Sequence, residues 1–246
     1  MRTLGWAAVT IACCLSSPAC AADLKPDFDR PLATQRIKAR SGADPAWPWI
    51  CTTYKDLMLR EDGSDTPAPD NATLVALNQV GRLACSKQVM AGQITLDTEG
   101  FVFEGRKGGF LVFTLVDING FMPFRVLDAG TGAVLFRDSM AINNGITSVA
   151  LDGPALRLSY RRSIEGSCGL PKGGAACWAS IVTAAAIPFE IATIGPPMQA
   201  CAASYRRGKA PAEDPSIVSY NVTLTLDPTG AAKTTASRKI GCEPMP

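Results

Sequence analysis

The sequence predicts a mainly β domain of antiparallel hairpins, sandwich-like or barrel-like, with one or two short helices and stabilising disulfides. Three observations support this fold class. Apolar residues alternate with polar ones in several segments, one turn chemistry recurs between these segments, and six cysteines follow a hydrophobic N-terminal leader. The chain has 246 residues, of which 47% are hydrophobic and 19% are charged, as is typical of a folded protein with a substantial core.

The N-terminus has the three-part layout of a secretory signal peptide. Met1 and Arg2 precede an apolar run over 4–15, and small residues at 19–21 precede Ala22. The run is shorter than the roughly 20 apolar residues that a transmembrane helix needs. We therefore expect a cleaved leader over 1–21 and a periplasmic or secreted protein with no transmembrane segment after cleavage. An uncleaved anchor and a lipoprotein acylated at Cys20 are the alternatives.

Removal of the leader discards Cys13, Cys14 and Cys20 and leaves an even number of cysteines. These are Cys51, Cys85, Cys168, Cys177, Cys201 and Cys242. In an exported chain such a set predicts up to three disulfides, although the sequence alone leaves their connectivity open. A glycine-rich segment with one proline favours a bond between Cys168 and Cys177. Pairing of neighbours then leaves Cys51 with Cys85 and Cys201 with Cys242.

Composition divides the mature chain into an arm and one domain. Residues 22–46 carry three prolines, many charges and few large apolar side chains, so we expect an extended arm there. We expect a single β-rich domain over 47–246. Near its start, Asn71 can cap a helix over 72–83, but a strand is almost equally favoured there.

The clearest strand patterns follow Gln93. Phe101 and Phe103 alternate with polar residues, and 110–116 is a continuous apolar run that predicts a strand buried on both faces. Alternation over 156–161 and 216–226 predicts two strands that each bury one face. A final strand is expected before Cys242.

A Leu-Asp pair followed by glycine recurs at four places, at Asp97, Asp128, Asp152 and Asp227. Aspartate accepts hydrogen bonds from turn amides, and glycine adopts the positive φ that tight turns need. Each turn is flanked by strand-like sequence. We therefore predict four hairpins.

The second turn lies in the segment Val-Leu-Asp-Ala-Gly-Thr-Gly-Ala-Val-Leu-Phe, residues 126–136. This segment resembles the inner hairpin of a β-propeller blade of the quinoprotein-like family. A propeller repeats its blades at a regular period, whereas the four turns are unevenly spaced. We interpret the segment as hairpin chemistry that many β folds share.

Two helices are predicted in the C-terminal half. Trp178, Ile181, Val182 and Ala185 fit one helical face, which ends before Pro188. A second short helix is expected over 198–205, with the preceding proline as its first residue.

The chain contains no histidine, which excludes serine or cysteine nucleophiles activated by a histidine base. It also has no Ser-x-x-Lys spacing, and its mature cysteines show no Cys-x-x-Cys spacing. Paired carboxylates remain as a route to hydrolysis. The candidates are Glu99, Glu104, Asp117, Glu165 and Glu190. We expect no metal and no cofactor, and an enzyme is less favoured than a binding protein.

Two features are candidates for binding. Trp47 and Trp49 flank a proline, where they can stack on a sugar ring or a peptide, or else pin the arm to the core. Ser-Tyr-Arg-Arg occurs at 159–162 and again at 204–207, although a match of this length also arises by chance. Arginine suits bidentate anion contacts, and the arginines concerned are Arg161, Arg162, Arg206 and Arg207.

These observations favour an exported, non-enzymatic binding or structural domain of the cell envelope. Its partner would be an unknown envelope protein or glycan. A formal net charge of +2 does not suggest nucleic acid as a partner. The alternatives are a histidine-free hydrolase of envelope glycans and a secreted enzyme inhibitor that acts through the 168–177 loop.

Overall fold

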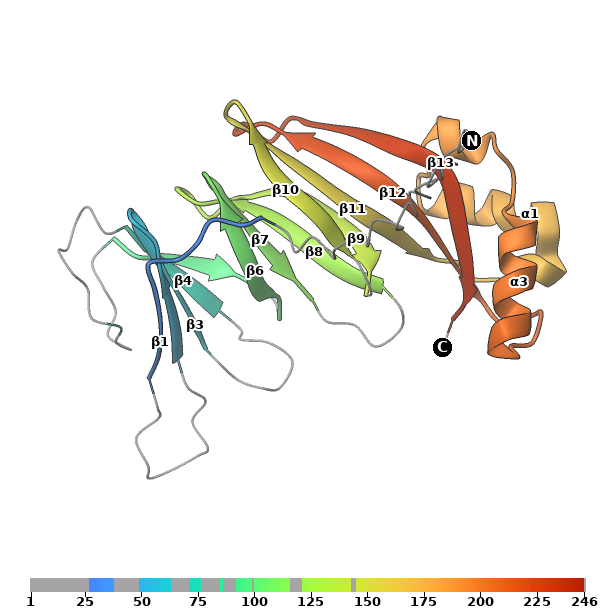
Figure 1. Cartoon of the computed structure of the whole chain (residues 1–246), viewed down its shortest axis with the longest axis horizontal. Helices are drawn as coiled ribbons and strands as arrows, with labels where there is room; N and C mark the ends of the chain where they lie inside the picture. The colour runs from blue at the N-terminus through green and yellow to red at the C-terminus, as the bar shows by residue number, and fades with distance from the viewer. Residues whose placement is uncertain are drawn as a thin grey trace, which may run out of the picture.

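The computed structural model describes residues 27–37, 49–62, 71–76, 85, 92–98, 100–115, 121–142 and 145–245. These residues form two antiparallel sheets and three helices. Figure 1 shows the N-terminal sheet at one end of the molecule and the helices at the other end. The predicted fold class, mainly antiparallel β with short helices and disulfides, is confirmed. The predicted leader, 1–21, lies outside the described residues.

The first sheet is a meander in which each strand pairs with the next. Its strands are β1 (Ala33–Ile37), β2 (Trp49–Thr53), β3 (Leu57–Asp62), β4 (Asn71–Ala76) and β5 (Ile94–Asp97). Strand β1 lies within the segment predicted as an arm, and it pairs with β2 as the edge of the sheet. The helix that we considered from residue 72 is wrong for its described part, because β4 pairs with both β3 and β5 there.

The second sheet has eight strands. They are β6 (Val102–Lys107), β7 (Phe110–Thr114), β8 (Phe121–Asp128), β9 (Val134–Ala141), β10 (Ile146–Asp152), β11 (Ala155–Glu165), β12 (Ser216–Leu226) and β13 (Ala232–Pro244). The order is β13-β12-β11-β9-β8-β7-β6, and β10 also pairs with β11. Strand β12 has the bounds that its alternation predicts, and its even-numbered residues are buried.

Three of the four recurring turns form hairpins, between β8 and β9, β10 and β11, and β12 and β13. The turn after Asp97 does not, because β5 belongs to the first sheet and β6 to the second. The fourth predicted hairpin is therefore wrong. Turn chemistry reverses the chain at this point, but it does not determine which strands pair.

Strand β7 lies between two hydrophobic cores, and all five of its residues are buried. Phe110 and Val112 face a core shared with β11, β12 and the helices. Leu111 and Phe113 face a second core, shared with the first sheet. The prediction of burial on both faces is confirmed for 110–114, and β7 joins the two layers of the molecule.

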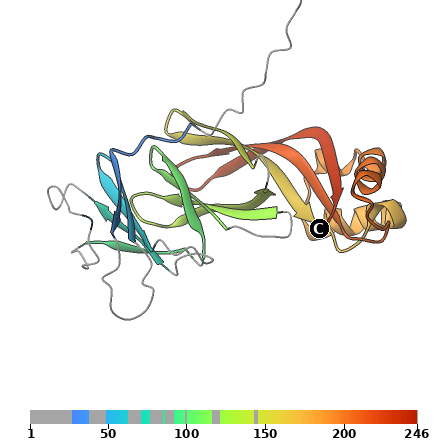
Figure 2. The same ribbon diagram turned by 60° about the horizontal axis from the view of Figure 1, so that its bottom comes forward.

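Strands β8 and β11, which lie on either side of β9 in the sheet, both contribute side chains to the first core. Figure 2 shows that this large sheet is strongly twisted. The rings of Phe124 and Tyr160 contact each other edge to face, with 4.9 Å between their centroids. This geometry is favourable for an aromatic pair.

Three helices, α1 (Leu170–Ala184), α2 (Phe189–Ala192) and α3 (Met198–Gly208), cover one end of this sheet, and α3 packs on β13. The one-turn helix α2 was not predicted. Helix α1 is interrupted at Gly174, whose φ of 51° and ψ of −131° suit glycine alone. Within the described residues, no helix is long and apolar enough to cross a membrane.

The cysteines form the three favoured pairs, Cys51–Cys85, Cys168–Cys177 and Cys201–Cys242. Cys201–Cys242 joins α3 to β13 and is buried. The segment between Cys168 and Cys177 forms the first turns of α1, and Leu170 within it is fully buried. It therefore does not project as a free loop.

Truncation on either face of β7 should destabilise the protein. Phe110→Ala should lower the free energy of unfolding by about 3–5 kcal/mol, and Leu111→Ala by about 2–5 kcal/mol, because each leaves a cavity in a different core. Denaturant unfolding measures both changes. Leu32→Ala, at a side chain that is 73% exposed, is the control and should change the value by less than about 0.5 kcal/mol. A near-zero effect at Phe110 or Leu111 would contradict the two-core arrangement.

The disulfides should differ in their contribution to stability. Cys201 and Cys242 are separated by 41 positions, and Cys168 and Cys177 by 9. In the chain-entropy model, removal of the longer link costs about 4 kcal/mol and removal of the shorter one about 2.5 kcal/mol. Paired alanine variants compared by urea unfolding test this order, and the reverse order would show that loop entropy does not dominate.

Candidate binding site

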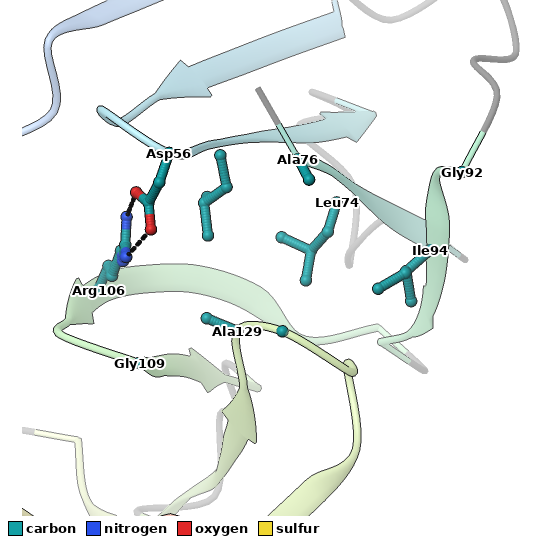
Figure 3. A pocket seen from close by; sticks show the side chains of 10 residues that line it. Asp56, Leu74, Ala76, Gly92, Ile94, Arg106, Gly109 and Ala129 are labelled. Carbon is teal, nitrogen blue, oxygen red and sulfur yellow. Dashed lines mark hydrogen bonds and ion pairs between the residues drawn. The ribbon is translucent and has the colours of Figure 1, made fainter. Parts of the chain in front are cut away.

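A pocket opens where the first sheet meets two turns of the second. Strands β3, β4 and β5 form one side, and the β6–β7 and β8–β9 turns form the other. Its volume is about 290 Å³. Figure 3 shows Leu74, Ala76 and Ile94 across the pocket from Ala129.

The lining is mainly aliphatic. It comprises Asp56, Leu57, Leu74, Ala76, Gly92, Ile94, Arg106, Gly109, Ala129 and Gly130. The two turns of the second sheet that line the pocket contain glycines. Because glycine has no side chain, the space at this end of the second core is left unfilled and forms the pocket. Apolar pockets with a few placed polar groups are the usual form of small-ligand sites.

Arg106 supplies the principal charged group of the lining. Its Nη1 and Nη2 donate to the carboxylate of Asp56 at 2.5 and 2.7 Å, and its Nε donates to the carbonyl of Gly108 at 2.7 Å. The guanidinium also lies 5.1 Å from the ring centroid of Tyr54. These contacts hold Arg106 at the rim of the pocket, as Figure 3 shows.

The Asp56–Arg106 pair determines the charge state of the rim. The hydrogen bonds from Arg106 lower the pKa of Asp56, which therefore stays ionised at neutral pH. A carboxylate held in this way is poorly suited to donate a proton as a general acid. Among the residues that the structure describes, the lining holds no second carboxylate, hydroxyl, thiol or amine side chain, so these residues are suited to binding and do not form an acid–base pair.

A second polar contact joins β3 of the first sheet to β6 of the second. The buried carboxylate of Glu61, on β3, accepts a hydrogen bond from the backbone N–H of Phe103 at 2.9 Å. This N–H lies at an irregularity in the pairing of β6 with β7. Burial raises the pKa of Glu61 despite this hydrogen bond.

The two arginines at 161 and 162 project from opposite faces of β11 and do not form one anion site. Arg162 faces the core side, where its Nε donates to Asp138 at 2.8 Å and its Nη1 donates to the Tyr220 hydroxyl at 2.9 Å. Tyr160 also donates to Asp138, at 2.5 Å. These contacts give Arg162 a structural role.

The Ser-Tyr-Arg-Arg match falls on a strand at 159–162 and on a helix at 204–207. The two copies therefore do not share a structure. Arg206 and Arg207 are exposed in the last turn of α3. Trp49 lies in β2, and Trp47 lies outside the described residues.

The three candidate carboxylates that the structure describes, Glu104, Glu165 and Glu190, do not line the pocket. Glu104 lies on β6, Glu165 ends β11, and Glu190 lies in α2. Glu99 and Asp117 are outside the described residues. Among the residues that the structure describes, no group of three or more acidic, cysteine or histidine side chains is placed to hold a metal ion.

Sequence reasoning missed the Asp56–Arg106 pair. The two residues are 50 positions apart, Asp56 in the β2–β3 turn of the first sheet and Arg106 on β6 of the second, so no local pattern connects them. Comparison with protein-family models, curated proteins and solved structures found no match. The functional interpretation therefore depends on the geometry of the chain itself.

The raised pKa of Glu61 predicts a pH dependence of stability. The carboxyl group of Glu61 loses its proton at a lower pH in the unfolded chain than in the folded one. Its contribution to the free energy of unfolding is therefore complete below the unfolded pKa, about 4.3, and is lost as pH rises through the folded pKa. Glu61→Gln keeps an acceptor for Phe103 and removes the buried charge. Urea unfolding between pH 4 and 8 should show this variant gaining stability over wild type as pH rises.

Glu165→Gln changes an exposed carboxylate in the same way and is the matched control for this series. A Glu61→Gln curve that runs parallel to wild type over the whole pH range would show that Glu61 is not desolvated.

Proposed function

We propose that the protein is an exported, non-enzymatic binding protein that holds a small aliphatic ligand, or the aliphatic side chain of a partner, in the pocket between the sheets. The single observation that carries this proposal is the aliphatic lining with one fixed guanidinium at its rim. The signal-peptide layout of 1–21 and the three disulfides support export.

The size of the pocket supports a small ligand. Its volume of about 290 Å³ lies just below the usual range for ligand sites, roughly 300–1,000 Å³. Each methylene buried there would contribute about 0.8 kcal/mol. Branched or short linear aliphatic groups fit this chemistry better than a sugar ring does, since sugars need many polar partners.

Arg106 supports a polar oxygen at one end of the ligand. Three of its five N–H groups donate to Asp56 and Gly108, and the remaining two form no hydrogen bond with the described residues. Asp56 already neutralises the guanidinium. A neutral carbonyl is therefore the preferred acceptor, and a carboxylate would have to compete with Asp56.

The test uses isovaleramide and isovalerate, which share one aliphatic group and differ in charge. Methyl-labelled protein titrated with either compound and followed by NMR should show shifts at Leu57, Leu74 and Ile94. The amide should bind more tightly than the acid. Ala129→Leu, which fills the pocket, should weaken binding at least about tenfold, the effect of about two buried methylenes.

Ala232→Leu makes the same change at an exposed position on β13 and should leave the shifts unchanged. If isovaleramide shifts none of the three methyl signals, or if both leucine variants bind equally well, the pocket is not the binding site.

A further inference from the structure

The outer face of β11, β12 and β13 is cationic and rich in hydroxyl groups. Even-numbered residues of β11 and β12 face the core, since Leu158, Tyr160, Val222 and Leu224 are buried. Over 157–161 of β11 and 221–225 of β12, the odd-numbered residues lie on the other face and are exposed or partly exposed. We call this outer surface the cationic face, and its residues are Arg157, Ser159, Arg161, Asn221, Thr223, Thr225, Lys233 and Thr235.

Strand register arranges these residues in rows. Arg157, Thr225 and Lys233 form one row across the three strands, and Ser159, Thr223 and Thr235 form the next. Arg161 lies opposite Asn221 in a third row. Arg157 and Arg161 are separated by about 13 Å along the strand, and Lys233 lies about 10 Å from Arg157 across two strand spacings.

Contacts with the neighbouring strands hold the Arg161 side chain in place on this face. Its Nε and Nη2 donate to the hydroxyl of Ser219 at 3.0 and 2.7 Å. A side chain at Gly241 would meet Nη2 at 2.5 Å, so glycine on β13 leaves room for the guanidinium. Arg161 forms no ion pair with any residue that the structure describes, and its charge remains available to a partner.

Carboxylates are confined to the ends of the cationic face. Asp152 and Asp227 lie at the hairpin ends of the strands, and Glu165 and Glu243 lie toward the opposite end. The carboxylate of Asp227 accepts hydrogen bonds from its own turn, from the backbone N–H and hydroxyl of Thr229 and the N–H of Ala231. The rows defined above therefore combine positive charge with hydroxyl groups and the amide of Asn221.

We propose that the cationic face docks an anionic polysaccharide. Three separated cations match a polymer with repeated negative groups, and the hydroxyls between them can donate to and accept from sugar hydroxyls. The residues of the face include no aromatic side chain, whereas single-stranded nucleic acids bind by stacking on aromatic rings. This site lies on the opposite side of the first core from the pocket and does not depend on the ligand proposed there.

The experiment measures binding of the protein to dextran sulfate and to polygalacturonate by affinity electrophoresis at low salt, with neutral dextran as the uncharged comparison. Arg157→Ser with Lys233→Ser removes two exposed charges for which the structure gives no side-chain bond. This double variant should raise the apparent Kd for the anionic polymers about tenfold, because each lost cation weakens attraction to the polymer. Neutral dextran should not bind either protein.

The matched control is Arg206→Ser with Arg207→Ser, which lowers the net charge equally on the exposed end of α3. It should change the Kd less than twofold. Equal weakening by the two double variants, no binding of wild type to either anionic polymer, or tighter binding of an oligothymidylate of matched charge would each overturn the proposal. Arg161→Ser, with thermal unfolding to confirm its fold, should weaken polysaccharide binding further.

Discussion

Strand β7 has no face in contact with water, and the arrangement of both sheets follows from this burial. Phe110 and Val112 contribute to one core, and Leu111 and Phe113 contribute to the other. Strand β7 therefore contributes buried side chains to both cores. The pocket forms where this shared layer ends, because the turns after β6 and β8 present Gly109 and Gly130 in place of large side chains.

Two polar contacts join the sheets beside the second core, and they differ in electrostatic character. Glu61 is buried and bound to a single backbone N–H, so its charge is disfavoured. Asp56 is exposed and ionised beside Arg106. The Arg106 side chain is largely buried, and its bond to Asp56 orients the guanidinium at the pocket.

Residue patterns within one strand predicted the fold well. Alternation in 216–226 identifies the buried face of β12, and the continuous apolar run that begins at Phe110 identifies a strand between two cores. Contacts between distant segments were not predictable in this way. The turn at Asp97 has hairpin chemistry, yet it joins two sheets, because strand partners are chosen by burial and not by the turn.

The same limit applies to the sites. Arg161 and Arg162 are adjacent and identical in type, but strand alternation places one on the cationic face and the other against Asp138. Both arginines were predicted as candidate binding residues, but the sequence alone did not predict that their roles differ. The pocket was not predicted, because Asp56 and Arg106 meet only after the sheets pack together.

The two proposed surfaces are separated by the structure that β7 organises. The pocket lies on the side of the second core, whereas the cationic face is the outer surface of β11 to β13, beyond the first core. Groups that are far apart and share no partners contribute almost additively. A polymer docked on the cationic face would therefore leave the pocket open to its ligand, so that one domain can be held on an anionic matrix while it binds a small molecule.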